Sequence, residues 1–299
     1  MTPANVALLA DRGVVRVTGA DALKLLQGII TNDMELLESQ PAIHAALLTP
    51  QGKILFDFFV VRAGDGFLLE TAKEKVADLA KRLNLYKLRA NVDIRDVSDD
   101  YRVSALWGSP PQGSGETAGS VTFPDPRLPA LGSRILAEVR FAADLATATH
   151  ALEASPQDYH ARRIALGVPE GGKDYLPGDT FPHEADLDQL NGVSFTKGCF
   201  VGQEVVSRMQ NRASVRKRVV PIEGEAPLSP GAEIEAGAAT IGTVGSAAGK
   251  LALALIRLDR AAEWSAKGEA LSADGVTVRV RKPDWATFDL DPIAAAEAP

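Results

Sequence analysis

Residues 194–204 read Ser-Phe-Thr-Lys-Gly-Cys-Phe-Val-Gly-Gln-Glu and include the one cysteine of the chain, Cys199. Apolar residues recur at helical spacing from Val201 onward, which predicts a helix that begins near Phe200. Cys199 would then lie at the N-terminus of this helix, beside Lys197. The helix dipole and the cation both favour the thiolate over the thiol, so the segment predicts a reactive sulfur.

A functional role for Cys199 competes with a plain structural one. Free cysteines are often small buried hydrophobes, and buried structural cysteines are inert. The neighbours Lys197, Gly198 and Gly202 favour function, because glycines let a ligand or another backbone approach closely. Three roles stay open: a thiolate nucleophile, a redox-sensitive thiol, or one ligand of a metal cluster shared with a partner. One thiol alone cannot hold a cluster.

The cysteine segment resembles a known signature. Lys-Gly-Cys-aromatic-x-Gly-Gln-Glu, followed four residues later by Arg208, is similar to the motif of YgfZ-type proteins. Further motifs occur in the expected order: Leu26-Gln27-Gly28 with Thr31-Asn32-Asp33, Thr49-Pro50-Gln51-Gly52-Lys53, Gly167-Val168-Pro169-Glu170-Gly171, and Pro182-His183-Glu184 with Leu187-Asp188. The resemblance covers nearly the whole chain. YgfZ-type proteins resemble the folate-binding T-protein of the glycine cleavage system and are related to mitochondrial iron–sulfur cluster assembly factors.

This resemblance implies an α+β fold with two α+β modules around a central folate cavity and a C-terminal β-barrel. The residues support the same class, since the predicted elements across residues 43–107 run β-β-β-α-β-β. After Arg216, short strand candidates separated by Gly and Pro predict a small barrel. The expected domains are a folate-binding region at 1–212, a barrel at 213–288 and a flexible tail at 289–299. Residues 108–120 are expected to form a long loop.

The resemblance implies tetrahydrofolate as the cofactor. T-proteins carry paired acids on the strand after the glycine-rich turn, whereas here only Asp57 occupies that strand, preceded by Phe56. Asp57 is either an ordinary strand position or the carboxylate that accepts the paired N–H donors of the pterin. Glu184 is either a solvated loop acid or a folate ligand. The predicted catalytic residues are Cys199, Lys197 and Asp57, and the predicted cofactor-binding residues are Asp57, Glu184, Gly198, Gln203, Glu204 and Arg208.

Several classes of site are not expected. A single cysteine excludes an internal disulfide and any four-cysteine metal site, and the four histidines lack metal-ligand spacing, so no metal site is predicted. The net charge of −7 argues against broad nucleic-acid binding. A basic run, Arg208 to Arg218, is either a solvated face or a contact for folate carboxylates or an RNA backbone.

A soluble, cytoplasmic protein is expected. The first fifteen residues lack the features of a secretory signal or a transit peptide, and the longest apolar runs are too short to span a bilayer. The predicted function is a tetrahydrofolate-binding accessory protein that supports iron–sulfur cluster assembly or repair and, through client enzymes, tRNA modification. The alternatives are a folate-dependent aminomethyl- or methyl-transferase and a direct tRNA-binding protein. The expected partners are folate and iron–sulfur client or assembly proteins, with a weak tRNA contact as a further alternative and no membrane.

Overall fold

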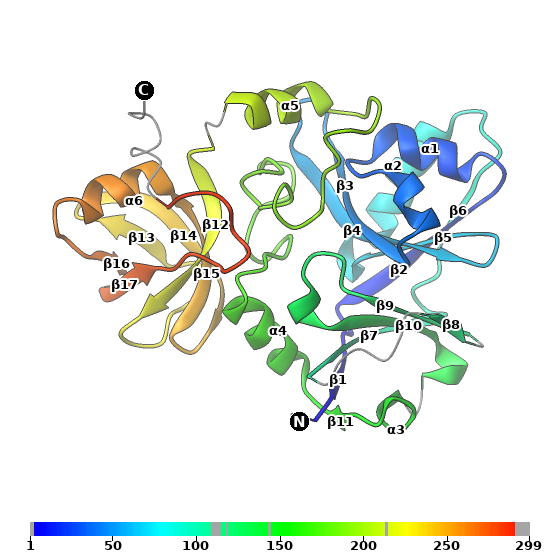
Figure 1. Ribbon diagram of the computed structural model, residues 1–299, viewed down its shortest axis with the longest axis horizontal. Helices are drawn as coiled ribbons and strands as arrows, with labels where there is room; N and C mark the ends of the chain where they lie inside the picture. Colours follow the sequence, from blue (N-terminus) through cyan, green and yellow to red (C-terminus); the bar gives the residue numbers. More distant parts are fainter. Residues whose placement is uncertain (1–2, 109–114, 118, 143–144, 213–214, 291–299) are drawn as a thin grey trace. The chain divides into compact units, whose positions relative to one another are not determined.

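The computed structural model describes residues 3–108, 115–117, 119–142, 145–212 and 215–290 (Figure 1). Contacts divide the chain into two compact units. Unit 1 is Met1–Tyr159 with Leu190–Gln203, and unit 2 is His160–Gln189 with Glu204–Pro299. The segment that carries the cysteine therefore belongs to unit 1, although most of its sequence neighbours on both sides belong to unit 2.

The first sheet of unit 1 is antiparallel throughout, in the order β3-β4-β5-β2-β6. Its strands are β2 (Arg12–Thr18), β3 (Ala42–Leu48), β4 (Ile54–Ala63), β5 (Gly66–Ala72) and β6 (Asp93–Asp96). Helices α1 (Ala22–Ile29) and α2 (Val76–Lys87) bury Leu26, Leu79 and Leu83 against one face of it. Period-2 alternation places every second strand residue on this core face, so the residues between them line the opposite face.

The second sheet of unit 1 has the order β11-β1-β7-β10-β9-β8. Its strands are β1 (Asn5–Leu8), β7 (Tyr101–Trp107), β8 (Gly115–Thr117), β9 (Ser120–Pro124), β10 (Ser133–Glu138) and β11 (Leu152–Glu153), and α3 (Leu145–Thr149) follows β10. Residues 108–120 were predicted to form a long loop. This prediction is wrong, because β8 and the first residue of β9 lie within that range. Residues 109–114 and 118 of that loop lie outside the described residues. Phe123 of β9 meets Phe59 of β4 edge to face at 6.1 Å, so the two sheets are in contact.

Unit 2 holds the predicted C-terminal barrel, which closes in the order β12-β15-β14-β13-β16-β17. Its strands are β12 (Lys217–Gly224), β13 (Glu233–Ala236), β14 (Ala239–Ala248), β15 (Leu251–Arg257), β16 (Leu271–Ala273) and β17 (Val276–Val280). The sequence did not predict α6 (Leu258–Ser265), which packs Leu258 and Ala261 onto the barrel core. The α+β class and the C-terminal barrel are confirmed. The boundary at residues 212–213 stays a prediction, and residues 291–299 of the predicted tail lie outside the described part.

Helix α4 (Pro156–Ala165) begins directly after Ser155. Its start has a reciprocal cap, because the Ser155 backbone N–H donates to Asp158 Oδ2 at 2.9 Å and the Asp158 N–H donates to Ser155 Oγ at 3.2 Å. Helix α5 (Gln203–Arg212) follows the cysteine segment. Short 3₁₀ helices lie at Met34–Glu38, Lys73–Lys75, Pro129–Leu131 and Val139–Phe141. Within the described ranges, no helix has the length and apolar composition needed to cross a bilayer.

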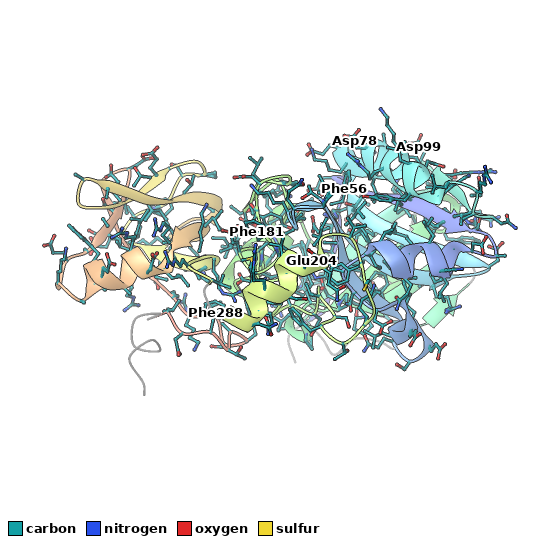
Figure 2. The ribbon with its side chains drawn as sticks, turned by 90° about the horizontal axis from the view of Figure 1, so that it is seen from above. Phe56, Asp78, Asp99, Phe181, Glu204 and Phe288 are labelled. Atoms are coloured by element: carbon teal, nitrogen blue, oxygen red, sulfur yellow. The ribbon has the colours of Figure 1, made fainter. Side chains whose placement is uncertain are left out.

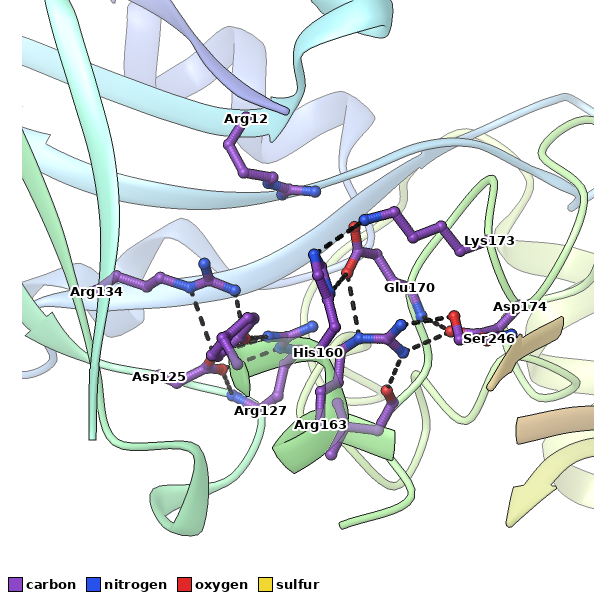
Figure 3. A network of polar contacts seen from close by, with 12 residues as sticks. Arg12, Asp125, Arg127, Arg134, His160, Arg163, Glu170, Lys173, Asp174 and Ser246 are labelled. Atoms are coloured by element: carbon purple, nitrogen blue, oxygen red, sulfur yellow. Dashed lines mark hydrogen bonds and ion pairs between the residues drawn. The ribbon is translucent and has the colours of Figure 1, made fainter. Parts of the chain in front are cut away.

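Buried ion pairs hold unit 2 together. Arg218 of β12 donates to Asp186 Oδ1 at 2.8 Å and to both carboxylate oxygens of Asp188 at 2.9 Å, and it lies over the ring of Phe288, labelled in Figure 2. Arg163 of α4 pairs with Asp174 and donates to Ser246 Oγ on β14 at 2.7 Å (Figure 3). These bonds tie the irregular segment before Leu190 to the barrel.

Candidate functional site at the cysteine loop

Cys199 lies in an exposed loop that precedes α5. The predicted helix start near Phe200 is wrong, because α5 begins at Gln203. Gly202 has a φ of +81°, a left-handed conformation that cannot belong to an α-helix. Cys199 is therefore four positions before the helix, and the argument from its dipole no longer applies. Gly198 beside it is also exposed, so the thiol faces an open surface.

Lys197 does not extend into solvent beside the thiol. Its side chain is buried, and its Nζ donates to the carbonyl oxygens of Gln27, Ile30 and Asn32, each at 2.8 Å. Burial lowers the pKa of Lys197 to about 8, while the negative charge of Asp33 opposes that shift. Three carbonyls use all three N–H donors of the ammonium, which fixes the loop to the end of α1.

The Thr31-Asn32 motif holds the start of the same loop. Thr31 Oγ1 donates to the Gly192 carbonyl at 2.6 Å, and the Ser194 N–H donates to the Thr31 carbonyl at 3.0 Å. Asn32 Nδ2 donates to the Asn191 carbonyl at 2.8 Å. Side chains that are 159 to 161 positions away in sequence thus replace the backbone partners that this irregular segment lacks.

The Thr49–Gly52 turn meets the other end of the loop at Gly202. A Cβ atom at Gly202 would lie 2.6 Å from the Thr49 carbonyl oxygen and 3.0 Å from Gly52 Cα. Both contacts are to backbone, which cannot move aside cheaply. Glycine is therefore required at 202 by close approach as well as by its φ. Three motifs that are remote in sequence come together around Cys199.

A pocket of about 470 Å³ lies in unit 1 beside this loop. Its lining residues are Asn32, Asp33, Leu36, Gln40, Ile43, His44, Pro126, Asn191, Val193, Ser194, Phe195 and Thr196. Burial, followed by the charge of Arg127, lowers the pKa of His44, so the imidazole is neutral at pH 7. His44 Nδ1 lies 3.1 Å from the Leu190 carbonyl, which fixes Nδ1 as the donor and leaves Nε2 as an acceptor.

Asp57 lies on β4 on the face of the sheet opposite the core of unit 1. Phe59 shares that face two residues on, and Glu70 of β5 pairs with Phe59 in register. Glu70 is fully buried; one carboxylate oxygen pairs with Arg12, and Oε2 has no hydrogen-bond partner among the described residues. Asp57 is half-buried. This face therefore presents two carboxylates, one with a free buried acceptor.

The remaining predicted residues belong to unit 2, except Gln203, which starts α5 in unit 1. Glu184 Oε2 accepts the Phe181 N–H at 2.9 Å and so stabilises its own turn. Glu204 and Arg208 are exposed on α5, where Figure 2 labels Glu204. The basic run that ends at Arg218 is not one continuous surface, because Arg218 is buried in ion pairs. No group of three His, Cys, Asp or Glu side chains in the described ranges is arranged to hold a metal ion.

A second charged group in unit 1 was not predicted from the sequence. Asp125 accepts from Arg127 Nε at 3.0 Å and Nη2 at 2.8 Å, and Arg134 Nε lies 3.7 Å from the same carboxylate (Figure 3). Both arginines donate to Tyr159 Oη, at 3.0 Å and 2.6 Å. Glu70 was not predicted either. The sequence signal that could have found Glu70 and Arg134 is a charged residue among the apolar residues of a strand, because a charged side chain is rarely buried unless it is paired.

Comparisons with known proteins agree with this architecture. Residues 216–288 match the CAF17 C-terminal beta-barrel domain, and residues 9–113 match the GCVT N-terminal domain. The chain is 33% identical over 93% of its length to the mitochondrial iron–sulfur cluster assembly factor IBA57 homolog of Mycosarcoma maydis and covers 83% of that protein. It is also 33% identical to the mitochondrial IBA57 of Mus musculus, over 93% of this chain and 84% of the relative. The chain belongs to the IBA57 family.

A solved structure shows the same fold as this chain. The aminomethyltransferase T of the glycine cleavage system from Bartonella henselae superposes with a TM-score of 0.78 at 17% identity, over 95% of this chain and 87% of that one. The T-protein-like fold and the relation to iron–sulfur assembly factors, both expected from the motifs, are confirmed. The cytoplasmic location is contradicted, because the IBA57 relatives are named mitochondrial. That prediction depended on features missing from the first fifteen residues, and such an absence does not determine a compartment.

Proposed function

We propose that this IBA57-family protein binds tetrahydrofolate and supports the assembly or repair of iron–sulfur clusters, with effects on tRNA modification through client enzymes. The family membership supports the assembly role. The T-protein-like fold supports folate, since the matched fold is that of an aminomethyltransferase. The observation that carries the folate proposal is the pair of carboxylates, Asp57 and Glu70, on one face of the first sheet.

The acceptors on this face suit a pterin. The 2-amino group and ring N–H of a pterin form a donor edge, and a carboxylate accepts two such donors in a bidentate pair. Asp57 would take that edge, and Glu70 Oε2 is a buried acceptor that needs a donor. Bound tetrahydrofolate would supply one-carbon chemistry. The residues of the chain would hold and orient it.

Cys199 is proposed as the reacting group toward a partner. It is exposed on a loop that is fixed by Lys197, Thr31 and Gly202, so the sulfur has a defined place on the surface. A single thiol requires the partner to supply the other ligands of a cluster or the other sulfur of a disulfide. The loop anchors reduce the entropy that ordering the loop would otherwise cost on association.

The folate proposal is tested by titration of tetrahydrofolate, followed by intrinsic tryptophan fluorescence. Replacing a carboxylate that holds a ligand costs about 1.5–3 kcal/mol, so Asp57→Asn is expected to weaken binding roughly tenfold or more. Asp93→Asn, on β6 of the same sheet, is the matched control because Asp93 is exposed, and it should leave affinity unchanged. Equal affinity of Asp57→Asn and the wild-type protein would remove Asp57 from the site.

The assembly proposal has a separate test. Cys199→Ala should lose complementation of a deletion strain, measured as the activity of a cluster-containing enzyme, while its tetrahydrofolate affinity and thermal midpoint stay unchanged. Full complementation by this variant would refute a chemical role for the sulfur. Because folate affinity is measured independently, failure of either half of the proposal is distinguishable from failure of the other.

An aminomethyltransferase remains the second candidate because of the matched fold. It predicts turnover of tetrahydrofolate with a methylamine donor, with Asp57 orienting the amine. Phe56 argues against it, since the resemblance places a second acid at that position in T-proteins. Binding of tetrahydrofolate without product above background would favour the accessory role.

A further inference from the structure

The end of α2 carries two leucines in solvent. Leu85 is 62% exposed and Leu88 is 85% exposed, the highest value among the large apolar side chains in the described ranges. Leu85 lies in the last turn of α2, and Leu88 is the first residue after that helix. Single exposed leucines are common, but a pair this exposed at one place requires an explanation.

Leu88 also has an unusual backbone. Its φ of 46° and ψ of −107° lie outside the left-handed helical region that commonly ends helices, and positive φ is costly for a residue with a bulky side chain. Glycine would adopt this conformation at lower cost. Strain of this kind persists only when the surrounding structure imposes it, and it gathers at functional positions.

Hydrogen bonds impose this conformation from both sides. Lys87 Nζ donates to the Val92 carbonyl at 2.8 Å, and the Ala90 N–H donates to the Lys87 carbonyl at 2.8 Å. The Asn91 N–H donates to Asp21 Oδ2 at 2.8 Å. The loop is therefore rigid, and the leucine it presents is ordered before any partner arrives, which lowers the entropic cost of association.

Basic residues surround the two leucines. Residues 81–89 contain four basic residues and no acid, in a chain of net charge −7. Lys81 and Arg82 are four and three positions before Leu85, and Arg89 follows Leu88; all three are exposed. Asp78, labelled on α2 in Figure 2, is the acid nearest before this run. Asp21, which accepts from the Asn91 N–H, and Asp93 bring two further carboxylates near this loop, so the four basic residues leave a local excess of positive charge in a chain that is negative as a whole.

We propose that residues 81–89 form a docking surface for an acidic protein that receives Leu85 and Leu88 in an apolar pocket. The basic rim would attract and orient the acidic partner, and the leucines would supply the buried contact. A membrane surface is the less favoured occupant, because bilayer affinity grows with buried apolar area and two leucines on a rigid loop offer little of it. The proposal does not depend on folate binding or on Cys199.

The test places the photoreactive residue benzoylphenylalanine at position 88 in cells, with position 176 as the control. Leu176 is 67% exposed and belongs to unit 2. The proposal expects a discrete protein adduct at 88 that is missing at 176. After purification, that adduct partner should bind the unmodified protein, lose about tenfold or more in affinity to Arg82→Glu/Arg89→Glu, and bind more weakly as salt increases.

Two further measurements keep the proposal open to refutation. Leu88→Gly should raise the thermal midpoint, because it removes strain, and should weaken partner binding at the same time. A leucine with only a structural role would lower the midpoint on removal and leave binding unchanged. Adducts at 88 that match those at 176, a partner whose affinity ignores salt, or leucine-dependent binding to phosphatidylcholine–phosphatidylserine vesicles would each overturn the protein-docking proposal.

Discussion

At the scale of single residues, Lys197 connects the sequence motif to the structure. Its position two residues before Cys199 predicted a cation that favours the thiolate. In the structure, the ammonium of Lys197 instead donates to three backbone carbonyls at and just after the end of α1. A lysine suits this place because a compact ammonium can send three N–H bonds in different directions, whereas the guanidinium of arginine is a planar fork.

Lys197→Met should lower the free energy of unfolding by about 3 kcal/mol at pH 7, because it leaves buried carbonyls without donors. The loss should depend on pH. The folded-state pKa of about 8 lies below the usual 10.5, so the unfolded chain keeps this proton longer than the folded one. The lysine's contribution to stability therefore rises between pH 8 and 10.5, and the gap between the two proteins should widen.

Chemical denaturation of both proteins across this pH range measures the effect. Lys24→Met, on the exposed side of α1, is the control for the loss of a lysine that lies in solvent. A constant gap between the wild-type protein and Lys197→Met would mean that the folded-state pKa of Lys197 is not lowered.

At the scale of elements, the contact between the two sheets of unit 1 is charged as well as apolar. Arg127 and Arg134 lie over the ring of Phe59 at 4.9 Å and 5.5 Å, and both face Asp125. Burial opposes ionisation of Asp125, but the two arginines outweigh it and lower its pKa. A carboxylate that joins the segment after β9 to Arg134 of β10 holds this side of the second sheet.

Asp125→Asn is expected to cost roughly 3–5 kcal/mol of unfolding free energy at pH 7, the usual result of removing one partner from a buried ion pair. Because the folded-state pKa lies below 3.8, the contribution of the carboxylate is complete above that pH. It is lost as the pH falls through the folded-state pKa, so the two proteins should converge in acid. Asp65→Asn, at a site that is 78% exposed, should change stability little.

At the scale of the whole molecule, each of the two units has buried apolar clusters of its own. Trp107 reports on unit 1, where it lies 6.0 Å from the ring of Tyr159. Trp264 and Trp285 report on unit 2, and Trp285 Nε1 donates to the Leu166 carbonyl at 2.8 Å. These tryptophans allow the unfolding of each unit to be followed by itself.

Urea unfolding should show two transitions when each unit is observed separately. Trp107→Phe leaves the probes of unit 2, and Trp264→Phe/Trp285→Phe leaves the probe of unit 1. Adding Asp125→Asn should move the unit 1 midpoint more than the unit 2 midpoint, because Asp125 and its partners Arg127 and Arg134 belong to unit 1. Identical midpoints and identical shifts would indicate a single cooperative transition instead.

Local sequence patterns were enough to predict the class of fold and most of its strands. The order β-β-β-α-β-β across residues 43–107 predicted β3 to β7 with α2, and the short strand candidates separated by Gly and Pro after Arg216 predicted the barrel, because these patterns act through neighbours in the chain. Local patterns failed at α6 and at the start of α5, where barrel contacts and Gly202 decided the outcome.

The contacts of the motif residues, in contrast, depend on how the chain folds in space. Lys197 meets carbonyls that are 165 to 170 positions away, and Gly202 meets the Thr49–Gly52 turn. Asp57 shares its face with Glu70 because strand register sets which side chains lie together. Hydrogen bonds and close packing act over a few ångströms in space, whatever the separation of the residues along the chain. The contacts around Cys199 could therefore not be predicted from local sequence patterns.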